Sequence, residues 1–236
     1  MTAATYSDVV AAAERIGPHV HHTPVMRSHL LDEWAGAEMH LKTENLQRVG
    51  AFKMRGATNA VLLLPDEVAA RGVAAHSSGN HAQALALAAR VRGIPAHIVM
   101  PRDAPSVKKA AVAGYGARII ECEPTSAARE TAVAEVIAET GAVEVHPYDN
   151  DHIIAGAGTA ALELMREVPG LDVVMAPVGG GGLLSGTSLA VHGIDAGVRV
   201  IGAEPLAADD AARSLEAGHP LPQPSPTTIA DGLRTR

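Results

Sequence analysis

Lys53 is the residue of this sequence best suited to covalent chemistry. It is one of only four lysines among 236 residues, and the aromatic Phe52 precedes it. Unlike arginine, lysine can lose its proton and act as a nucleophile or a base. We expect burial and the nearby charge of Arg55 to lower its pKa, and Gly50 and Gly56 to allow close backbone approach. The alternative for such a residue is an exposed lysine in a loop bounded by glycines.

A run of four glycines, Gly179 to Gly182, is the second feature that points to a ligand. It follows a strand predicted over 172–176 and precedes a helix predicted over 183–191, so its amides lie at a helix N-terminus. Converging amides and the helix dipole favour an anion at such a position. The run has neither the Gly-x-Gly-x-x-Gly spacing nor the Lys-Ser/Thr ending of nucleotide-binding loops. We interpret it as a phosphate cradle rather than as a flexible turn.

A polar turn over 76–81, with the sequence His-Ser-Ser-Gly-Asn-His, follows another predicted strand. Ligands of parallel α/β sheets bind at this end of the strands. The turn offers two hydroxyls, an amide and two imidazoles, so it suits a polar ligand. The alternative is structural, because Asn80 is also a common residue type for capping the helix that follows.

The composition excludes several classes of protein. The net charge of −7 and the aromatic content of 2% predict no nucleic-acid partner. No apolar run approaches the ~20 residues that a membrane helix needs, and the N-terminus does not resemble a signal peptide. The single cysteine, Cys122, fits a small buried residue in a reducing compartment. We therefore expect a cytoplasmic protein with no membrane partner.

The predicted elements alternate between strands and helices. Helices are predicted over 6–16, 58–64, 82–91, 105–112, 126–139, 153–167, 183–191 and 209–216, and strands over 39–42, 73–75, 96–100, 118–122, 143–145, 172–176 and 198–203. This alternation has the spacing of βαβ units and predicts parallel sheets covered by helices. The histidines at 19, 21 and 22 lack the spacing of a metal site, so we interpret their segment as a polar loop.

The lysine, the glycine run and the polar turn together fit pyridoxal phosphate. Its aldehyde needs the lysine, its phosphate needs the glycines, and its hydroxyl needs a side-chain donor. At these residues the sequence resembles the fold type II pyridoxal-phosphate enzymes, and within them the group of serine/threonine dehydratases (threonine ammonia-lyases) and serine racemases. The matching segments are Thr23-Pro24, 42–47, 50–57, 77–83, 156–159, 179–182 and 228–232.

The resemblance implies a role for each matching residue. Lys53 would hold the cofactor as an imine and move the α-proton of the substrate, and Ser78 would be a second acid or base on the opposite face of the ring. The remaining roles would be these: Gly179, Gly180, Gly181, Gly182 and Leu183 bind the phosphate, Asn80 donates to the ring hydroxyl, Phe52 packs beside the ring, and Ser77, Ser78, Gly79 and His81 hold the substrate carboxylate.

The resemblance also implies a reaction, carried out by a homodimer on a small hydroxy amino acid. This reaction would convert L-threonine or L-serine to a 2-oxo acid and ammonia. Serine racemisation and dehydration of 3-hydroxyaspartate are the close alternatives. A divalent-cation site like that of the serine racemase branch, for Mg²⁺ or Ca²⁺, is expected at Glu204, Ala208 and Asp210. An acidic helix start is the alternative for these residues.

The expected fold class is α/β, with two parallel-sheet domains of the tryptophan-synthase-β-like, fold type II kind and the cofactor in the cleft between them. Residues 46–145 would form the smaller domain, and residues 1–45 and 146–236 the larger one. Family members usually continue beyond the match at Asp231-Gly232, so the C-terminal part of the larger domain is expected to be missing. A cofactor-binding protein without turnover is therefore an alternative from another class.

Overall fold

The structure is a computed structural model that describes residues 3–77, 79–223 and 227–234. Its α-helices are α1 (Tyr6–Ile16), α2 (His29–Ala35), α3 (Lys53–Leu63), α4 (Asp66–Ala69), α5 (Asn80–Arg92), α6 (Ser106–Gly114), α7 (Ser126–Thr140), α8 (Asp151–Glu167), α9 (Gly182–Ile194) and α10 (Asp210–Ala217). Its strands are β1 (Val25–Met26), β2 (Leu41–Lys42), β3 (Val73–His76), β4 (Ala96–Pro101), β5 (Arg118–Cys122), β6 (Val143–Glu144), β7 (Val173–Pro177) and β8 (Arg199–Ala203). Short 3₁₀ turns are η1 (Gly17–His19), η2 (Glu44–Leu46), η3 (Arg48–Gly50) and η4 (Asp231–Leu233).

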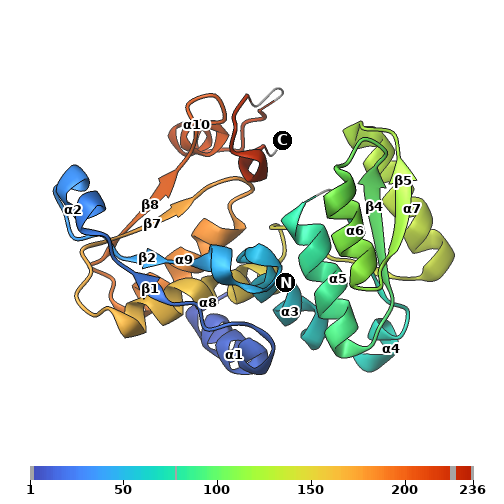
Figure 1. The fold of residues 1–236 in the computed structure, drawn as a ribbon, viewed down its shortest axis with the longest axis horizontal. Helices are drawn as coiled ribbons and strands as arrows, with labels where there is room; N and C mark the ends of the chain where they lie inside the picture. Colours follow the sequence, from blue (N-terminus) through green and yellow to red (C-terminus); the bar gives the residue numbers. More distant parts are fainter. Residues whose placement is uncertain (1–2, 78, 224–226, 235–236) are drawn as a thin grey trace.

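The sheets are parallel where helices connect the strands. A four-stranded sheet has the order β5-β4-β3-β6, and β7 pairs with β8, all in parallel. Only the short pair β1–β2 is antiparallel among the described strands. Figure 1 shows α5, α6 and α7 around the four-stranded sheet, and α8, α9 and α10 near β7 and β8. The predicted α/β class with parallel sheets is confirmed.

Buried apolar side chains form three clusters. The first lies between α3, α5 and the four-stranded sheet and includes Val61, Leu85 and Ile98. The second contains residues of β3, β4 and α7. The third joins α1, α8, α9 and β7 through residues such as Val9 and Leu162. Helix α8 contributes to the first cluster and to the third, so it connects the two groups of elements.

Glycines allow α8 to lie against two neighbouring helices at backbone distance. A Cβ on Gly156 would be 2.7 Å from a carbonyl oxygen of α3, and a Cβ on Gly158 would be 2.5 Å from the carbonyl oxygen of Gly186 in α9. Close packing cannot accommodate such contacts, so both crossings require glycine. Helix α3 begins at Lys53 and α9 begins at Gly182. Helix α8 therefore sets the position of the lysine relative to the glycine run.

Four helices begin earlier than the sequence predicts: α3 by five residues, α5 and α8 by two, and α9 by one. Helix α3 begins at Lys53 instead of residue 58, because Gly56 lies inside the helix rather than before it. A Cβ on Gly56 would be 2.8 Å from the carbonyl oxygen of Ile153, which explains a glycine at a position that usually disfavours it. Helix α5 begins at Asn80.

None of the described helices is long and apolar enough to cross a membrane.

Candidate active site

The amine of Lys53 is directed at the segment that precedes α8. Its Nζ donates a hydrogen bond to the carbonyl oxygen of Pro147 at 2.7 Å, and it lies 5.2 Å from the centre of the Phe52 ring. Burial lowers the pKa of Lys53 from 10.5 to about 8. A much larger fraction of this amine is therefore neutral, and able to attack a carbonyl carbon, near pH 7 than for a lysine in water.

Arg55 does not act on Lys53 as the sequence led us to expect. Its side chain is fully buried and forms ion pairs with Glu44 at 2.8 Å and Glu163 at 2.7 Å. These carboxylates neutralise the guanidinium, and burial alone lowers the pKa of Lys53. The expectation that the charge of Arg55 lowers this pKa is wrong.

Gly179, Gly180 and Gly181 lie in the turn between β7 and α9, and Gly182 is the first residue of α9. Gly181 is the N-cap residue of α9 with a φ of +83°, and a Cβ there would meet no described atom within 4 Å. Gly180 differs, because a Cβ there would be 2.2 Å from the ring of Tyr148. Gly179 lies in the turn, and Leu183 in the first turn of α9. The open side at Gly181, beside helix amides that lack intrahelical acceptors, suits an anion.

The dipeptide Pro147-Tyr148 connects the amine with the glycine turn. Pro147 accepts the hydrogen bond from Lys53, and Tyr148 contacts the turn through both its ring and its backbone. A Cβ on Gly182 would be 2.9 Å from the carbonyl oxygen of Tyr148. Two of the three features singled out in the sequence thus meet on adjacent residues. The sequence analysis missed this dipeptide; its one signal is an aromatic residue in a loop between a strand and a helix.

The polar turn is at the C-terminal end of β3, where α5 begins. Gly79 is the N-cap residue of α5 and has no side chain to cap it, while Asn80 is the first helical residue and is exposed. The capping alternative for Asn80 is therefore wrong, and its side-chain amide has no hydrogen-bond partner among the described residues, so it can contact a ligand. Ser77 is partly buried in the same turn. Ser78 lies outside the described residues, so its expected roles stay predictions.

His81 is buried at the start of α5, where its ring cannot bind a carboxylate. Its Nε2 lies 2.8 Å from the carbonyl oxygen of Val145, so this nitrogen is the donor of a neutral imidazole. Burial, followed by the charges of Lys53 and His146, lowers the pKa of His81 to about 3. The other ring nitrogen is buried without a partner among the described residues. A contact with a substrate carboxylate would come from the backbone amide of His81 in the first turn of α5.

A further histidine, His146, lies near the amine. The ring of His146 is edge-on to that of Tyr148, with centroids 4.6 Å apart, and burial lowers the pKa of His146. The carboxylates of Asp149 and Glu144 oppose this change in pKa, whereas the charges of His76 and Lys53 add to it, so each of these groups is close enough to interact with His146. Because burial lowers its pKa, the His146 imidazole offers a hydrogen bond near the lysine without adding much positive charge. No motif in the sequence indicated His146.

The three residues expected to hold a cation lie between β8 and α10 or at the start of α10. The carboxylate of Glu204 accepts hydrogen bonds from the amides of Ala211 at 3.1 Å and Ala212 at 2.9 Å, in the first turn of α10. Asp210 is the first residue of α10, and Ala208 is buried. Glu204 therefore stabilises a helix N-terminus, as in the structural alternative, although its oxygens keep lone pairs for a cation.

A different group of residues has the spacing of metal ligands in the described part of the chain. Ligand atoms of His22, Glu163 and Glu167 all lie within 4.8 Å of one another. Lys42 already pairs with both carboxylates, at 2.8 Å for Glu163 and 2.9 Å for Glu167. The ammonium group occupies the position a cation would take, so these residues form an ion-pair network.

Comparisons with known proteins place this geometry among related enzymes. A family model described as "Pyridoxal-phosphate dependent enzyme" matches residues 16–236. The chain is 54% identical over 229 residues to the beta-hydroxyaspartate dehydratase of Paracoccus denitrificans, a match that covers 97% of this chain and 73% of that protein.

Two solved structures are similar over nearly all of this chain. Maize serine racemase superimposes with a TM-score of 0.97 at 47% identity, over 99% of this chain and 71% of the maize chain. A threonine deaminase from T.th. superimposes with a TM-score of 0.92 at 46% identity, over 98% of this chain and 75% of the other.

Proposed function

Because the chain belongs to the pyridoxal-phosphate-dependent enzymes of fold type II, we propose that it dehydrates and deaminates a small β-hydroxy amino acid. The α-proton and the β-hydroxyl leave as water, and hydrolysis of the resulting enamine gives a 2-oxo acid and ammonia. The meeting of Lys53 and the glycine turn on Pro147-Tyr148 is the observation that supports this most directly. When bound, pyridoxal phosphate supplies an aldehyde for the lysine and an electron sink for the α-carbon.

The residues present fit this cofactor. The buried amine of Lys53 suits the aldehyde, and the open side of the turn at Gly181 suits the phosphate. We propose that Gly179 to Gly182 with Leu183 bind the phosphate, that Asn80 donates to the ring hydroxyl, and that Phe52 packs beside the ring. Pro147 holds the amine in place until the cofactor enters.

The start of α5 is the proposed position of the substrate carboxylate. Helix amides there lack intrahelical acceptors, and Ser77 and Gly79 lie in the same turn. Lys53 then moves the α-proton, since a pKa near 8 lets the amine give and take a proton near neutral pH. Ser78 is the proposed second acid or base, which racemisation of serine would also need.

L-Serine and L-threonine are the substrates we propose first. A 3-hydroxyaspartate is the second candidate, favoured by the 54% identity to the Paracoccus dehydratase. The imidazole of His146 near Lys53 also favours it, since it offers a donor for a second carboxylate. Product analysis separates these activities: pyruvate or 2-oxobutanoate indicates serine or threonine dehydration, oxaloacetate indicates hydroxyaspartate dehydration, and D-serine indicates racemisation.

Trapping the cofactor tests the site directly. Borohydride reduction of the protein with pyridoxal phosphate should leave the cofactor on the peptide that contains Lys53, and Lys53→Ala should abolish this adduct and the product. An adduct on another lysine, detected by mass spectrometry, would place the site elsewhere. An adduct on Lys53 without any product would instead indicate a cofactor-binding protein without turnover.

Four further expectations accompany this function as proposals. Residues 46–145 form the smaller domain, and residues 1–45 with 146–236 form the larger one. The separation of apolar clusters on either side of α8 supports this division.

We also propose a cytoplasmic homodimer with Mg²⁺ or Ca²⁺ at Glu204, Ala208 and Asp210. Addition of either ion should raise the melting temperature, and Glu204→Gln should remove that increase; an unchanged melting temperature would leave Glu204 as a helix cap.

A further inference from the structure

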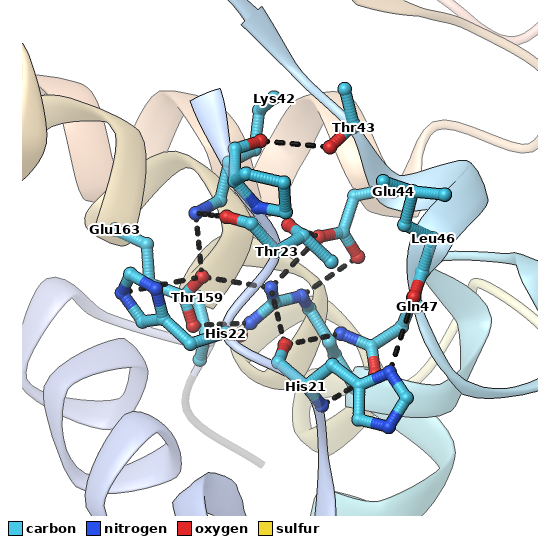
Figure 2. Close-up of polar contacts among 12 residues, drawn as sticks. His21, His22, Thr23, Lys42, Thr43, Glu44, Leu46, Gln47, Thr159 and Glu163 are labelled. Atoms are coloured by element: carbon cyan, nitrogen blue, oxygen red, sulfur yellow. Dashed lines mark hydrogen bonds and ion pairs between the residues drawn. The ribbon is translucent and has the colours of Figure 1, made fainter. Parts of the chain in front are cut away.

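Two carboxylates hold Arg55 in the first turn of α3, two residues from the reactive lysine. Nε and Nη2 each donate to Glu44 at 2.8 Å. Nη1 and Nη2 donate to Glu163 at 2.7 Å and 2.9 Å. Figure 2 shows Glu44 and Glu163 on two sides of the group of polar contacts that it draws. Both pairs are bidentate, which fixes the guanidinium in position and in plane.

The partners of Arg55 are themselves held by other side chains (Figure 2). Thr23 donates to Glu44 at 2.6 Å, and Lys42 pairs with Glu163 at 2.8 Å. The hydroxyl of Thr159 accepts from Arg55 at 3.2 Å and donates to a carbonyl oxygen of α8 at 2.7 Å. A buried network in which each member is satisfied specifies one arrangement of the elements it joins.

Helix α3 has no side-chain cap at its N-terminus. Its N-cap residue is Phe52, whose side chain offers no acceptor for the first amides. Two local backbone hydrogen bonds close the first turn, from the amide of Met54 to Ala51 at 3.3 Å and from the amide of Arg55 to Phe52 at 3.0 Å. The side chain of Arg55 adds contacts with distant elements to this turn, since Glu44 is in η2 and Glu163 is in α8.

We propose that Arg55 is a positioning residue for Lys53, holding the first turn of α3 so that the amine stays at Pro147. This inference rests on the proposed function, in which Lys53 is the residue that reacts. Arg55 is fully buried and bonded through all three nitrogens to Glu44, Glu163 and Thr159, so it acts through Lys53 and not on the substrate.

A second arginine, at the end of α5, supports the other end of α3 and provides a matched control. Arg92 donates to the carbonyl oxygens of Val61 and Leu64, where α3 ends, and to the carboxylate of Asp66. Arg92→Lys is therefore the same change at a contact with the opposite end of the helix. A purely structural role for Arg55 predicts that the two variants behave alike once their stabilities are taken into account.

The test compares Arg55→Lys, Arg92→Lys and the wild-type protein by two measurements. Lysine keeps the charge but cannot form two bidentate pairs. With the substrate that product analysis selects, Arg55→Lys should lower kcat by about 10- to 100-fold, the range expected for a displaced catalytic group, with little change in KM. In the apoprotein, ¹³C-methyl labelling of the lysines and NMR titration should show the pKa of Lys53 rising from about 8 toward 10.5. Arg92→Lys should leave both values near those of the wild type.

Equal effects of Arg55→Lys and Arg92→Lys on kcat and on the Lys53 pKa would overturn the inference. Should Arg55→Lys fail to fold, Glu163→Gln keeps the side-chain size and should shift both values in the same direction by less; no shift in that variant would also overturn it. The titration uses apoprotein, so it tests positioning even if no adduct forms. A wild-type protein without a borohydride-stable adduct would refute the proposed function separately.

Discussion

The ring of Tyr148 lies against Gly180 so closely that a Cβ at residue 180 would be 2.2 Å from the ring. The preceding residue, Pro147, accepts the hydrogen bond from Lys53 at 2.7 Å. One short segment before α8 thus contacts the amine and the glycine turn together. The spacing between the two cofactor-binding parts therefore depends on how this segment packs.

We expect Gly180→Ala to weaken cofactor binding because the new methyl group must displace the Tyr148 ring. The overpacking should also cost about 1–3 kcal/mol of unfolding free energy. When the ring is absent, the new methyl group has nothing to displace. Gly180→Ala should therefore cause smaller losses of binding and stability when it is added to Tyr148→Ala than when it is added to the wild type. Titration with pyridoxal phosphate and urea unfolding of the three variants measure these effects. Strictly additive losses would show that the two residues are not coupled.

The sequence predicted the residues whose chemistry is local. Lys53 is recognisable because lysines are few in this sequence and a lysine can react as a free amine. Gly179 to Gly182 are recognisable because glycines between a strand and a helix can bind an anion through their own backbone amides. Pro147 and Tyr148 could not be found in this way. Their contacts join residues far apart along the chain, and neither residue type indicates a ligand by itself.

The errors in the sequence analysis also have physical causes. Gly56 lies inside α3 rather than before the helix predicted over 58–64, although the close backbone approach expected at this glycine is present, at the carbonyl oxygen of Ile153. Arg55 was expected to act on its sequence neighbour, whereas it pairs with Glu44 and Glu163 from other elements. Asn80 was a candidate cap, yet Gly79 precedes the helix. In each case a tertiary contact or a neighbouring residue replaced the local rule.

The lowered pKa of Lys53 predicts how cofactor attachment depends on pH. The amine attacks an aldehyde only as the free base, so the attachment rate in apoprotein should rise with pH and level off above about 8. Stopped-flow absorbance at fixed pyridoxal phosphate concentration would give the midpoint. A midpoint near 10.5, the ordinary pKa of a lysine side chain, would show that the amine is not buried in solution.

His81 should make the protein less stable in acid. Its folded-state pKa of about 3 is below the ordinary 6.5, so the unfolded chain binds a proton that the folded one refuses. Its contribution to stability is complete above pH 6.5 and is lost as the pH falls toward 3, by at most about 1.4 kcal/mol per pH unit. Urea unfolding from pH 7 to 5 should show that the unfolding free energy falls less steeply with decreasing pH for His81→Asn than for the wild type. His219→Asn, at an exposed position after α10, is the control; equal slopes for His81→Asn and this control would contradict the prediction.

Gly158 tests whether α8 holds the glycine turn in place. A Cβ there would be 2.5 Å from the carbonyl oxygen of Gly186, a backbone atom that can move only if α9 moves. Gly158→Ala should therefore lower the unfolding free energy by about 1–3 kcal/mol and weaken pyridoxal phosphate binding, because α9 begins in the cradle. Gly114→Ala is the matched control, since a Cβ at this helical position meets no described atom within 4 Å and alanine favours helix by up to about 1 kcal/mol. Urea unfolding and cofactor titration of both variants measure the difference. If Gly158→Ala binds the cofactor as tightly as Gly114→Ala, the crossing of α8 and α9 does not control the cradle.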